Sequence, residues 1–502
     1  MEQEPGHQQS SSSIPRDHAS PKTATLSPLD QLMPPCYTRI FFIFETQDQD
    51  NCLQTLNRGL GALCTWVPYI TGHVFQAQDR KQFSIRWSTD HIITPVIQEI
   101  KAGARMPSLA ELQRSRAPIH HFQDSLAPVG WAQTTKEAPI FAASHSKLDG
   151  ALLLCVCIHH NVMDGGGFAE FMRLWTLACR GEAATAVDAE EPLRRPARIR
   201  DALSTASGET PSSSKNIIRP RSTSTSTSPL STPIEPLAPG RSKIFSFPVA
   251  KLLQTRYAME ELEGLGNLTN NQVLNALIWS IITRVRMERI RTSRGALLAG
   301  ESSRLGFAMN ARSRLGEDFA DGRFLGNVNV NGLAEISGST LEEASRYNPT
   351  ILPSEEKNRS RSLTSLAEVV SAVRSAVACV TKEYIAEVVS IVEQAPDVQT
   401  VALGWQIFST LDLTLSSWAN LPFYELDFGP GAGKPAFVRV PQVEADGLVI
   451  ILPRNRVVDE RIEALVALND DDMHALEADE HWQQWQGDEP MNSSTGDRSS
   501  KI

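Results

Sequence analysis

A His-x-x-x-Asp pattern, whose side chains can take part in proton transfer, occurs three times in this chain, at 120–124, 145–149 and 160–164. The first copy lies in a polar stretch flanked by proline, which is typical of a surface loop. The second copy is followed by Gly150, and an Asp-Gly pair favours a hairpin turn. The surroundings therefore single out the third copy as the one with catalytic potential.

His160 follows the uninterrupted apolar segment 151–158, which predicts a buried strand directly behind the imidazole. After Asp164 come Gly165-Gly166-Gly167, and the segment 168–180 then has a helical pattern. Glycines permit a sharp turn from strand to helix and leave room for a ligand. An unperturbed imidazole has a pKa of about 6.5, so it can accept a proton from a hydroxyl at neutral pH. These features favour a general base over a buried histidine that only satisfies its hydrogen bonds.

Metal binding is the alternative for this segment, because His159, His160 and Asp164 carry zinc-ligating groups. Neighbours on a strand point to opposite faces, however, and the helical His-Glu-x-x-His arrangement is absent from the sequence. The seven cysteines are scattered, and Cys155 and Cys157 alternate along an apolar strand, which is typical of buried, reduced thiols. We therefore expect no metal site and a reducing compartment.

Composition indicates a globular enzyme. Of the 502 residues, 41% are hydrophobic and 21% are charged, with a formal net charge of −10. This negative balance argues against nucleic acid as the main partner. No apolar run approaches the roughly 18 residues that a membrane span needs, and the N-terminus lacks the order of a signal peptide. We expect a cytoplasmic protein without a membrane span.

A Ser/Thr/Pro-rich tract separates two halves of periodic sequence, and its composition cannot bury a core. Strand and helix patterns are mixed in both halves, which favours an α/β or α+β fold in layers. The predicted organisation is a disordered leader at 1–24, domains at 25–203 and 241–488, a linker at 204–240 and a disordered tail at 489–502.

Hydrophobic periodicity predicts individual elements. Strands are expected at 37–45, 140–145, 151–159, 242–247, 304–309, 448–452 and 462–468, and helices at 51–63, 168–180, 269–286 and 470–479. Thr269 is expected to cap the third of these helices.

From 160 to 165 the chain resembles the BAHD acyltransferase family, within the chloramphenicol-acetyltransferase-like group. The second motif of that family, usually Asp-Phe-Gly-Trp-Gly, reads Asp-Phe-Gly-Pro-Gly at 427–431. Further resemblances follow in the expected order at 26–30, 66–74, 269–286, 310–314 and 326–327, and 416–418 is similar to the fungal branch that includes trichothecene O-acetyltransferases.

The resemblance implies two chloramphenicol-acetyltransferase-like domains, each a mixed sheet with flanking helices, which form a channel reached from two openings. It implies a monomer without a permanently bound cofactor. Acyl-CoA, with acetyl-CoA favoured, would enter from one side, and a small alcohol from the other. His160 would take the hydroxyl proton as the oxygen attacks the thioester, without a covalent acyl-enzyme. A terpenoid, alkaloid or polyketide of secondary metabolism is the implied acceptor.

By the same resemblance, Asp164 shapes the turn with Gly165 through an arginine ion pair, and Arg312 and Arg314 are the candidate partners. Breaking such a buried pair would damage the fold around the base. Asp427 is placed beside His160 as catalytic, although organising a turn is an equally open role for it.

Gly429 and Gly431 would hold the interface and the coenzyme A channel beside Asp427. Pro430 departs from the family's tryptophan, so a locally rebuilt loop is expected. Four cations could supply charge for the phosphates of coenzyme A, with solvated surface cations as the alternative: Lys251, Arg256, Arg312 and Lys434.

Two other functions stay open. A non-catalytic module could keep the fold as a binding scaffold, and a condensation-type enzyme could receive its acyl group from a carrier protein. The intact His160 turn speaks against the first, and the absence of a carrier or adenylating region from the sequence speaks against the second.

Overall fold

The computed structural model describes residues 21–486 with gaps at 78–81, 91, 104–105, 134, 186, 207–217, 221–239, 263–264, 295–300, 321–323, 350–355, 409 and 457–459. The predicted tail lies outside the described residues, as do most of the predicted leader and linker. The leader prediction is too long at its end, because β1 (Lys22–Thr25) pairs with β4 (Phe83–Trp87) as an antiparallel edge strand.

The N-terminal half is built on a five-stranded mixed sheet in the order β15-β2-β8-β7-β5. Its strands are β2 (Tyr37–Glu45), β5 (Ile97–Glu99), β7 (Phe141–Leu148), β8 (Ala151–His159) and β15 (Pro435–Arg439). Beside it lies a four-stranded sheet in the order β1-β4-β3-β6, with β3 (His73–Gln76) and β6 (Glu137–Pro139). The helices of this half are α2 (Gln49–Trp66), α3 (Leu109–Ser115) and α4 (Gly165–Arg180), with short 3₁₀ turns η1 (Pro68–Thr71), η2 (Ile119–His121) and η3 (Asp124–Leu126).

The C-terminal half is built on a six-stranded mixed sheet in the order β10-β17-β16-β14-β11-β12. Its strands are β10 (Gly240–Pro248), β11 (Ser302–Asn310), β12 (Asn329–Ser337), β14 (Leu413–Ser417), β16 (Leu448–Ile451) and β17 (Arg461–Asn469). Its helices are α7 (Val249–Glu260), α8 (Asn270–Arg294), α11 (Gly338–Ala344), α12 (Glu356–Ala378), α14 (Asp470–Ala478) and α15 (Glu480–Gln483). The predicted cap of α8 is confirmed, since the Thr269 hydroxyl accepts from the Gln272 amide at 3.2 Å.

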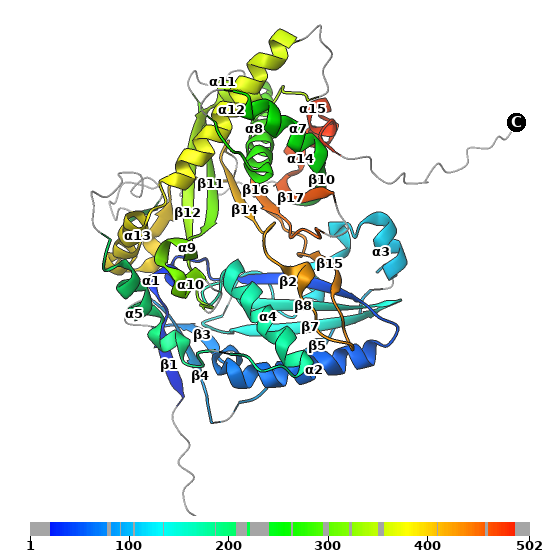
Figure 1. Ribbon diagram of the computed structural model, residues 1–502, viewed down its shortest axis with the longest axis vertical. Coiled ribbons are helices and arrows are strands. Elements are labelled where there is room, and N and C mark those ends of the chain that lie inside the picture. The colour runs from blue at the N-terminus through cyan, green and yellow to red at the C-terminus, as the bar shows by residue number, and fades with distance from the viewer. Residues whose placement is uncertain are drawn as a thin grey trace, which may run out of the picture.

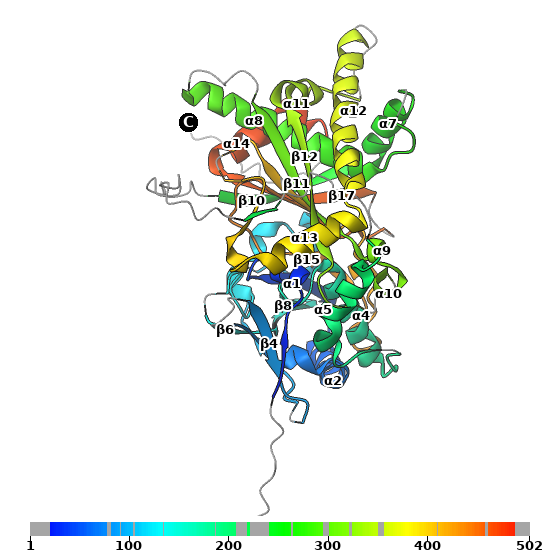
Figure 2. The same ribbon diagram turned by 90° about the vertical axis from the view of Figure 1, so that its left-hand side faces the viewer.

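Further elements complete the structure, and those of them that Figures 1 and 2 label lie where the two halves meet. They are α1 (Pro28–Gln31), α5 (Glu191–Leu203), α9 (Arg312–Leu315), α10 (Glu317–Ala320), α13 (Lys382–Gln394), the pair β9 (Ile218–Pro220) and β13 (Val401–Leu403), and the 3₁₀ turns η6 (Val398–Thr400) and η7 (Phe423–Glu425). β15 also joins the halves, because it follows the C-terminal strand β14 in the chain yet pairs with β2 (Figure 1). The N-terminal sheet is therefore completed by a strand from beyond the linker.

β8 is the strand that carries His160 at its end, and all nine of its residues are buried. Side chains alternate between two clusters, so Leu154 and Val156 face the core under α2 and α4 while Cys155 and Cys157 face the opposite one. The expected buried thiols are confirmed at these two positions. A strand buried on both faces gives the residue that follows it a rigid support.

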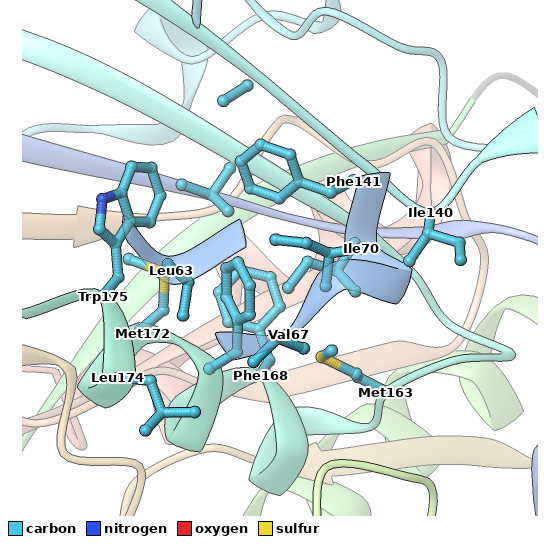
Figure 3. Close-up of a cluster of buried hydrophobic side chains, with 14 of the residues drawn as sticks. Leu63, Val67, Ile70, Ile140, Phe141, Met163, Phe168, Met172, Leu174 and Trp175 are labelled. Atoms are coloured by element: carbon cyan, nitrogen blue, oxygen red, sulfur yellow. The ribbon is translucent and has the colours of Figure 1, made fainter. Parts of the chain in front are cut away.

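The core beneath α4 fixes that helix against the sheet, as Figure 3 shows. Phe168, Met172 and Trp175 of α4 pack with Leu63 and Val67 at the end of α2. Burying a large apolar side chain stabilises by about 1.5 to 3 kcal/mol. The turn between β8 and α4 is thus anchored at both ends.

Membrane crossing by a single helix is not supported in the described part of the chain, where no one helix is long and apolar enough. The segments 358–378 and 382–394 pass that test only as a pair, by length and composition, and the pair is bent by 68°.

Candidate active site

His160 is the first residue after β8, and main-chain hydrogen bonds fix it on both sides. Its amide donates to the Cys36 carbonyl at 2.7 Å, and its carbonyl accepts from the Asn327 side chain at 3.0 Å. Cys36 precedes β2, whereas Asn327 precedes β12 of the C-terminal half. The half-buried imidazole therefore stands where the two halves meet.

His159 points away from that position, as the strand period predicts. Its Nε2 lies 2.8 Å from the Gln133 side-chain oxygen, and its ring packs edge-on against Tyr37 with centroids 5.1 Å apart. Burial, and then the neighbouring His160, lower the pKa of His159 from 6.5 to about 3. Among the described residues, no group of three or more His, Cys, Asp or Glu side chains could hold a metal ion.

The other two His-x-x-x-Asp copies have the surroundings expected from the sequence. His145 is a buried residue of β7, and Gly150 turns the hairpin into β8 with a φ of +77°. His120 lies exposed in the short turn η2. Neither copy approaches a strand-to-helix junction.

The imidazole of His160 is held mainly neutral by its surroundings. Burial lowers its pKa below the ordinary 6.5, and the nearby negative charge of Asp164 opposes that effect without cancelling it. A neutral imidazole can accept a proton from a hydroxyl. The site thus has an acceptor in the correct protonation state at neutral pH.

Asp164 caps α4 and pairs with Arg312, which identifies the arginine that the sequence left open. The two contacts to the guanidinium measure 2.9 and 3.0 Å, and the carboxylate also accepts from the amides of Gly167 and Val328, both at 2.8 Å. Burial would raise the pKa of Asp164, but the Arg312 charge and these hydrogen bonds hold it below the ordinary value. Arg314 instead donates to the carbonyl of Val377 in α12 and to that of Val380 just after this helix.

The glycines after Asp164 begin the helix rather than precede it, because the Asp164 cap already orders the first turn. Their lack of a side chain is required by close contacts. A Cβ on Gly166 would lie 2.5 Å from a guanidinium nitrogen of Arg312, and one on Gly167 would lie 2.0 Å from the Leu325 carbonyl oxygen. Because these glycines have no side chains, the first turn of α4 can pack directly against the C-terminal half.

Asp427 has an exposed carboxylate that accepts from the amide of Gly429 at 2.9 Å, and Gly429 has a φ of +85°. The Asp427 carbonyl accepts from Arg180, the last residue of α4. Asp164 caps the opposite end of this 16-residue helix, which is about 24 Å long, so Asp427 contacts the end of α4 that lies away from Asp164. The hydrogen bond of Asp427 fits a role in organising the turn, and the catalytic role expected for it beside His160 stays a prediction.

The rest of the second motif docks on the N-terminal half. Phe428 packs edge-on against Phe44 and Trp175, with centroids 5.2 and 6.1 Å apart. A Cβ on Gly431 would lie 2.1 Å from the Thr55 hydroxyl oxygen. The loop with Pro430 thus leads β15 onto the sheet of the other half.

The four cations expected for coenzyme A phosphates do not form one cluster. Arg312 is buried against Asp164, so its charge is not available at a surface. Lys251 donates to the carbonyls of Gln484 and Gln486, and Arg256 pairs with Glu260 at 3.8 Å, both on α7. Lys434 lies exposed directly before β15, beside the Asp427 loop. Of the four, only Lys434 is both exposed and close to the second motif.

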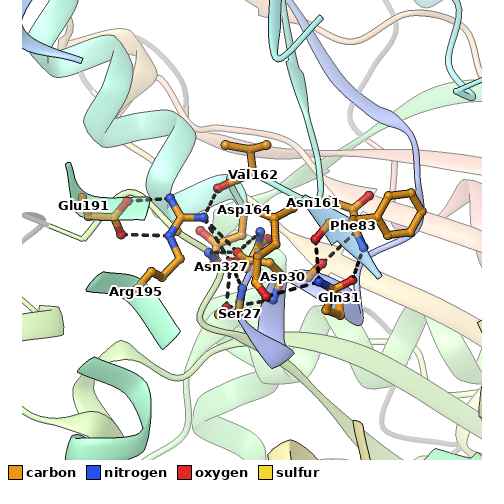
Figure 4. A network of polar contacts seen from close by, with 12 residues as sticks. Ser27, Asp30, Gln31, Phe83, Asn161, Val162, Asp164, Glu191, Arg195 and Asn327 are labelled. Carbon is orange, nitrogen blue, oxygen red and sulfur yellow. Dashed lines mark hydrogen bonds and ion pairs between the residues drawn. The ribbon is translucent and has the colours of Figure 1, made fainter. Parts of the chain in front are cut away.

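A buried polar network around Asp30 is the part of the site that the sequence did not predict (Figure 4). Asp30 belongs to the resemblance at 26–30 and Asn327 to that at 326–327, but neither pattern indicates that the two residues meet. Arg195, which pairs with Asp30 at 3.1 Å, carried no local signal because 165 positions separate the two residues.

Known proteins resemble this chain over most of its length. The sequence matches the Transferase family over residues 8–482. It is 30% identical to trichothecene 8-O-acetyltransferase of Fusarium sporotrichioides over 499 aligned residues, which cover 92% of this chain and 98% of that protein.

Two solved structures resemble the fold. F. sporotrichioides TRI101, complexed with coenzyme A and T-2, matches 92% of this chain and 99% of its own with a TM-score of 0.72 at 21% identity. F. graminearum TRI101, complexed with coenzyme A and deoxynivalenol, matches with the same coverages and a TM-score of 0.73 at 19% identity. The predicted architecture of two chloramphenicol-acetyltransferase-like domains is thereby confirmed.

Proposed function

Because the chain belongs to the Transferase family of BAHD acyltransferases, which makes it a coenzyme-A-dependent acyltransferase, we propose that it acetylates a hydroxyl of a secondary metabolite with His160 as general base. The observation that carries this proposal is the neutral, half-buried imidazole fastened between the two halves. The acetyl group is proposed from the name of the 30% identical relative, a trichothecene 8-O-acetyltransferase. The terpenoid, alkaloid or polyketide acceptor is proposed from the resemblance to the acyltransferase family.

The reaction proceeds by direct transfer. The imidazole of His160 accepts the hydroxyl proton while the acceptor oxygen forms a bond to the thioester carbonyl carbon. The tetrahedral intermediate then collapses, the carbon–sulfur bond breaks, and the departing thiolate takes the proton from the imidazolium. Asp164 keeps its charge throughout and holds the turn through Arg312, so it touches neither substrate. The imidazole ends the cycle neutral and ready for another acceptor.

We assign Lys434 to the phosphates of coenzyme A, because an exposed ammonium beside the interdomain loop can attract them. Lys434→Ala should raise the KM for acetyl-CoA several-fold and leave the KM for the acceptor unchanged. Lys251→Ala is the matched control, since the Lys251 ammonium already caps two carbonyls. Equal KM values in both variants would contradict the assignment.

We further propose that the protein is a cytoplasmic monomer. Static light scattering of the purified chain tests the oligomeric state, and cell fractionation tests the location.

The test of the reaction offers acetyl-CoA with a panel of hydroxylated metabolites that includes deoxynivalenol and T-2. Mass spectrometry should show products heavier by one acetyl group with the wild type, and their formation should nearly vanish with His160→Ala. A product that persists at the full rate in the variant would overturn the mechanism. A carrier-bound acetyl group that reacts where acetyl-CoA does not would overturn the choice of donor.

A further inference from the structure

A fully buried ionic cluster lies directly behind the His160 turn. The Arg195 guanidinium contacts both carboxylate oxygens of Asp30 at 3.1 Å, and it meets Glu191 at 2.6 and 2.9 Å. The side chains of Arg195, Asp30 and Glu191 are 1%, 0% and 2% exposed. Burying three charges costs free energy unless every polar atom is well bonded. Such a cluster calls for an explanation beyond stability.

Hydrogen bonds connect this cluster to the main chain of the turn (Figure 4). The nitrogen of Arg195 that contacts Asp30 also donates to the Val162 carbonyl at 2.9 Å. The side-chain nitrogen of Asn327 donates to Asp30 at 2.8 Å and to the His160 carbonyl at 3.0 Å. The carbonyls of the base and of the residue two positions later are thus both held from the cluster side.

Asn161 lies between these two residues and is held through its side chain, which donates hydrogen bonds instead of accepting them. The side-chain nitrogen of Asn161 donates to the carbonyls of Asp30 and Met33, both at 2.8 Å. Three successive residues of the turn therefore bond to the segment that carries Asp30 or to its partners. The His160 amide, bonded to Cys36, adds a fourth attachment.

The cluster also leaves no space for adjustment. A Cβ on Gly326 would lie 2.4 Å from Arg195 Nε, so the chain before Asn327 passes directly over the guanidinium. Arg195 further stacks over the Phe324 ring at 5.8 Å. Because Phe324 and Asn327 precede β12 in the C-terminal half, docking of that half is part of what fixes the turn.

We propose that Arg195, Asp30 and Asn327 are positioning residues, which hold the main chain of the turn so that the His160 imidazole keeps one direction. This inference rests on the proposed role of His160 as general base. None of the three touches a substrate. A displacement of a catalytic group by about 1 Å can lower a rate by about 100-fold, so a rigid main chain at the base has a direct effect on turnover.

The test compares Asn327→Ala and Arg195→Lys with the wild type. Asn327→Ala removes the bond to the His160 carbonyl, and Arg195→Lys keeps the charge but loses the planar fork. Both should lower kcat at least about 10-fold, a loss in the range expected when a base is poorly placed. The KM for acetyl-CoA and its calorimetric Kd should stay within about twofold of the wild type, because the turn is expected to move and not the coenzyme A channel.

Arg286→Lys is the matched control. Arg286 is also a fully buried arginine between two carboxylates, Asp446 and Asp472, and it also donates to main-chain carbonyls, but it lies within the C-terminal half. Its variant should lose thermal stability to a similar extent while kcat per coenzyme-A-binding site stays near the wild-type value. If Asn327→Ala and Arg195→Lys keep a kcat within twofold of this control, the positioning role is wrong.

Two further variants keep the outcomes separate. Gly326→Ala changes no charge, and the three atoms nearest to its new Cβ all belong to Arg195, so it takes the place of Arg195→Lys if that protein does not fold. His160→Ala is measured in parallel. A full rate in His160→Ala would overturn the proposed function, whereas an inactive His160→Ala beside fully active Asn327→Ala and Gly326→Ala would overturn only the positioning role.

Discussion

Asp164 and Arg312 form a two-point ion pair that joins the start of α4 to the C-terminal half, with contacts of 2.9 and 3.0 Å. The arginine side chain is 7% exposed and the carboxylate 5%. The aspartate, the fifth residue of the His-x-x-x-Asp pattern, therefore fixes the interface, whereas the histidine is the proposed base. Substitutions of the two residues should therefore have different effects.

Asp164→Asn should lower the free energy of unfolding by about 3 to 5 kcal/mol, because it leaves the Arg312 charge buried without its partner. Urea unfolding followed by tryptophan fluorescence measures the change. Arg314→Met is the matched control, since Arg314 bonds to main-chain carbonyls of Val377 and Val380, and it should cost no more than about 1.5 kcal/mol. Equal losses in the two variants would show that the Asp164 pair has no special weight.

The acid limb of the pH–rate profile should lie below pH 6.5. Burial lowers the pKa of His160, so the imidazole remains unprotonated, and the enzyme active, as the pH falls to that value. Asp164 opposes the shift, so any active Asp164→Asn protein should have its limb at still lower pH. Initial rates under kcat/KM conditions between about pH 5 and pH 8 test both expectations. A limb above pH 6.5 would contradict them.

Gly167→Ala should destabilise the protein and reduce turnover, because the new methyl would meet the Leu325 carbonyl oxygen at 2.0 Å and main chain cannot move aside cheaply. A cost of about 1 to 3 kcal/mol is expected from overpacking. Gly165→Ala is the control within the same helix turn, since its nearest neighbour is the flexible end of Leu421 at 3.3 Å. Its thermal midpoint should match the wild type or rise, because alanine favours helix. The opposite order of midpoints would refute the close contact.

The sequence predicted the strands that support the site better than the ion pairs that connect the site to the rest of the chain. β2 and β8 have the predicted bounds, because continuous apolar runs bounded by polar or turn residues define a buried strand locally. α12 was not predicted, although Leu366, Val369, Val370 and Val373 give it a buried face at helical spacing, because Ser and Arg residues obscure that pattern. The choice between Arg312 and Arg314 needed the structure, since two positions on one turn face different neighbours only after the halves dock.

Arg195 shows most clearly which contacts cannot be predicted from the sequence alone. Its partner Asp30 lies 165 positions earlier, and no spacing rule connects an arginine on α5 with a carboxylate at the start of the chain. Asp427 shows a different case, because its motif points to catalysis whereas the hydrogen bond of its carboxylate lies within its own turn, so the choice between the two roles stays a prediction. Local sequence can single out a candidate base, whereas the groups that hold this residue in place depend on tertiary packing.

Asp427→Asn and Asp427→Ala distinguish the two roles considered for this residue. An asparagine oxygen can accept from the Gly429 amide as the carboxylate does, at the present 2.9 Å, and it preserves the turn without the charge. Asp427→Asn should therefore keep kcat within about threefold of the wild type, whereas Asp427→Ala should lose more activity and raise the KM for acetyl-CoA as the loop before β15 loosens. Steady-state kinetics with acetyl-CoA, alongside thermal melts, decide the matter. If both variants lose activity equally while the fold stays intact, the negative charge itself is required, and Asp427 acts on the reaction from the far end of α4.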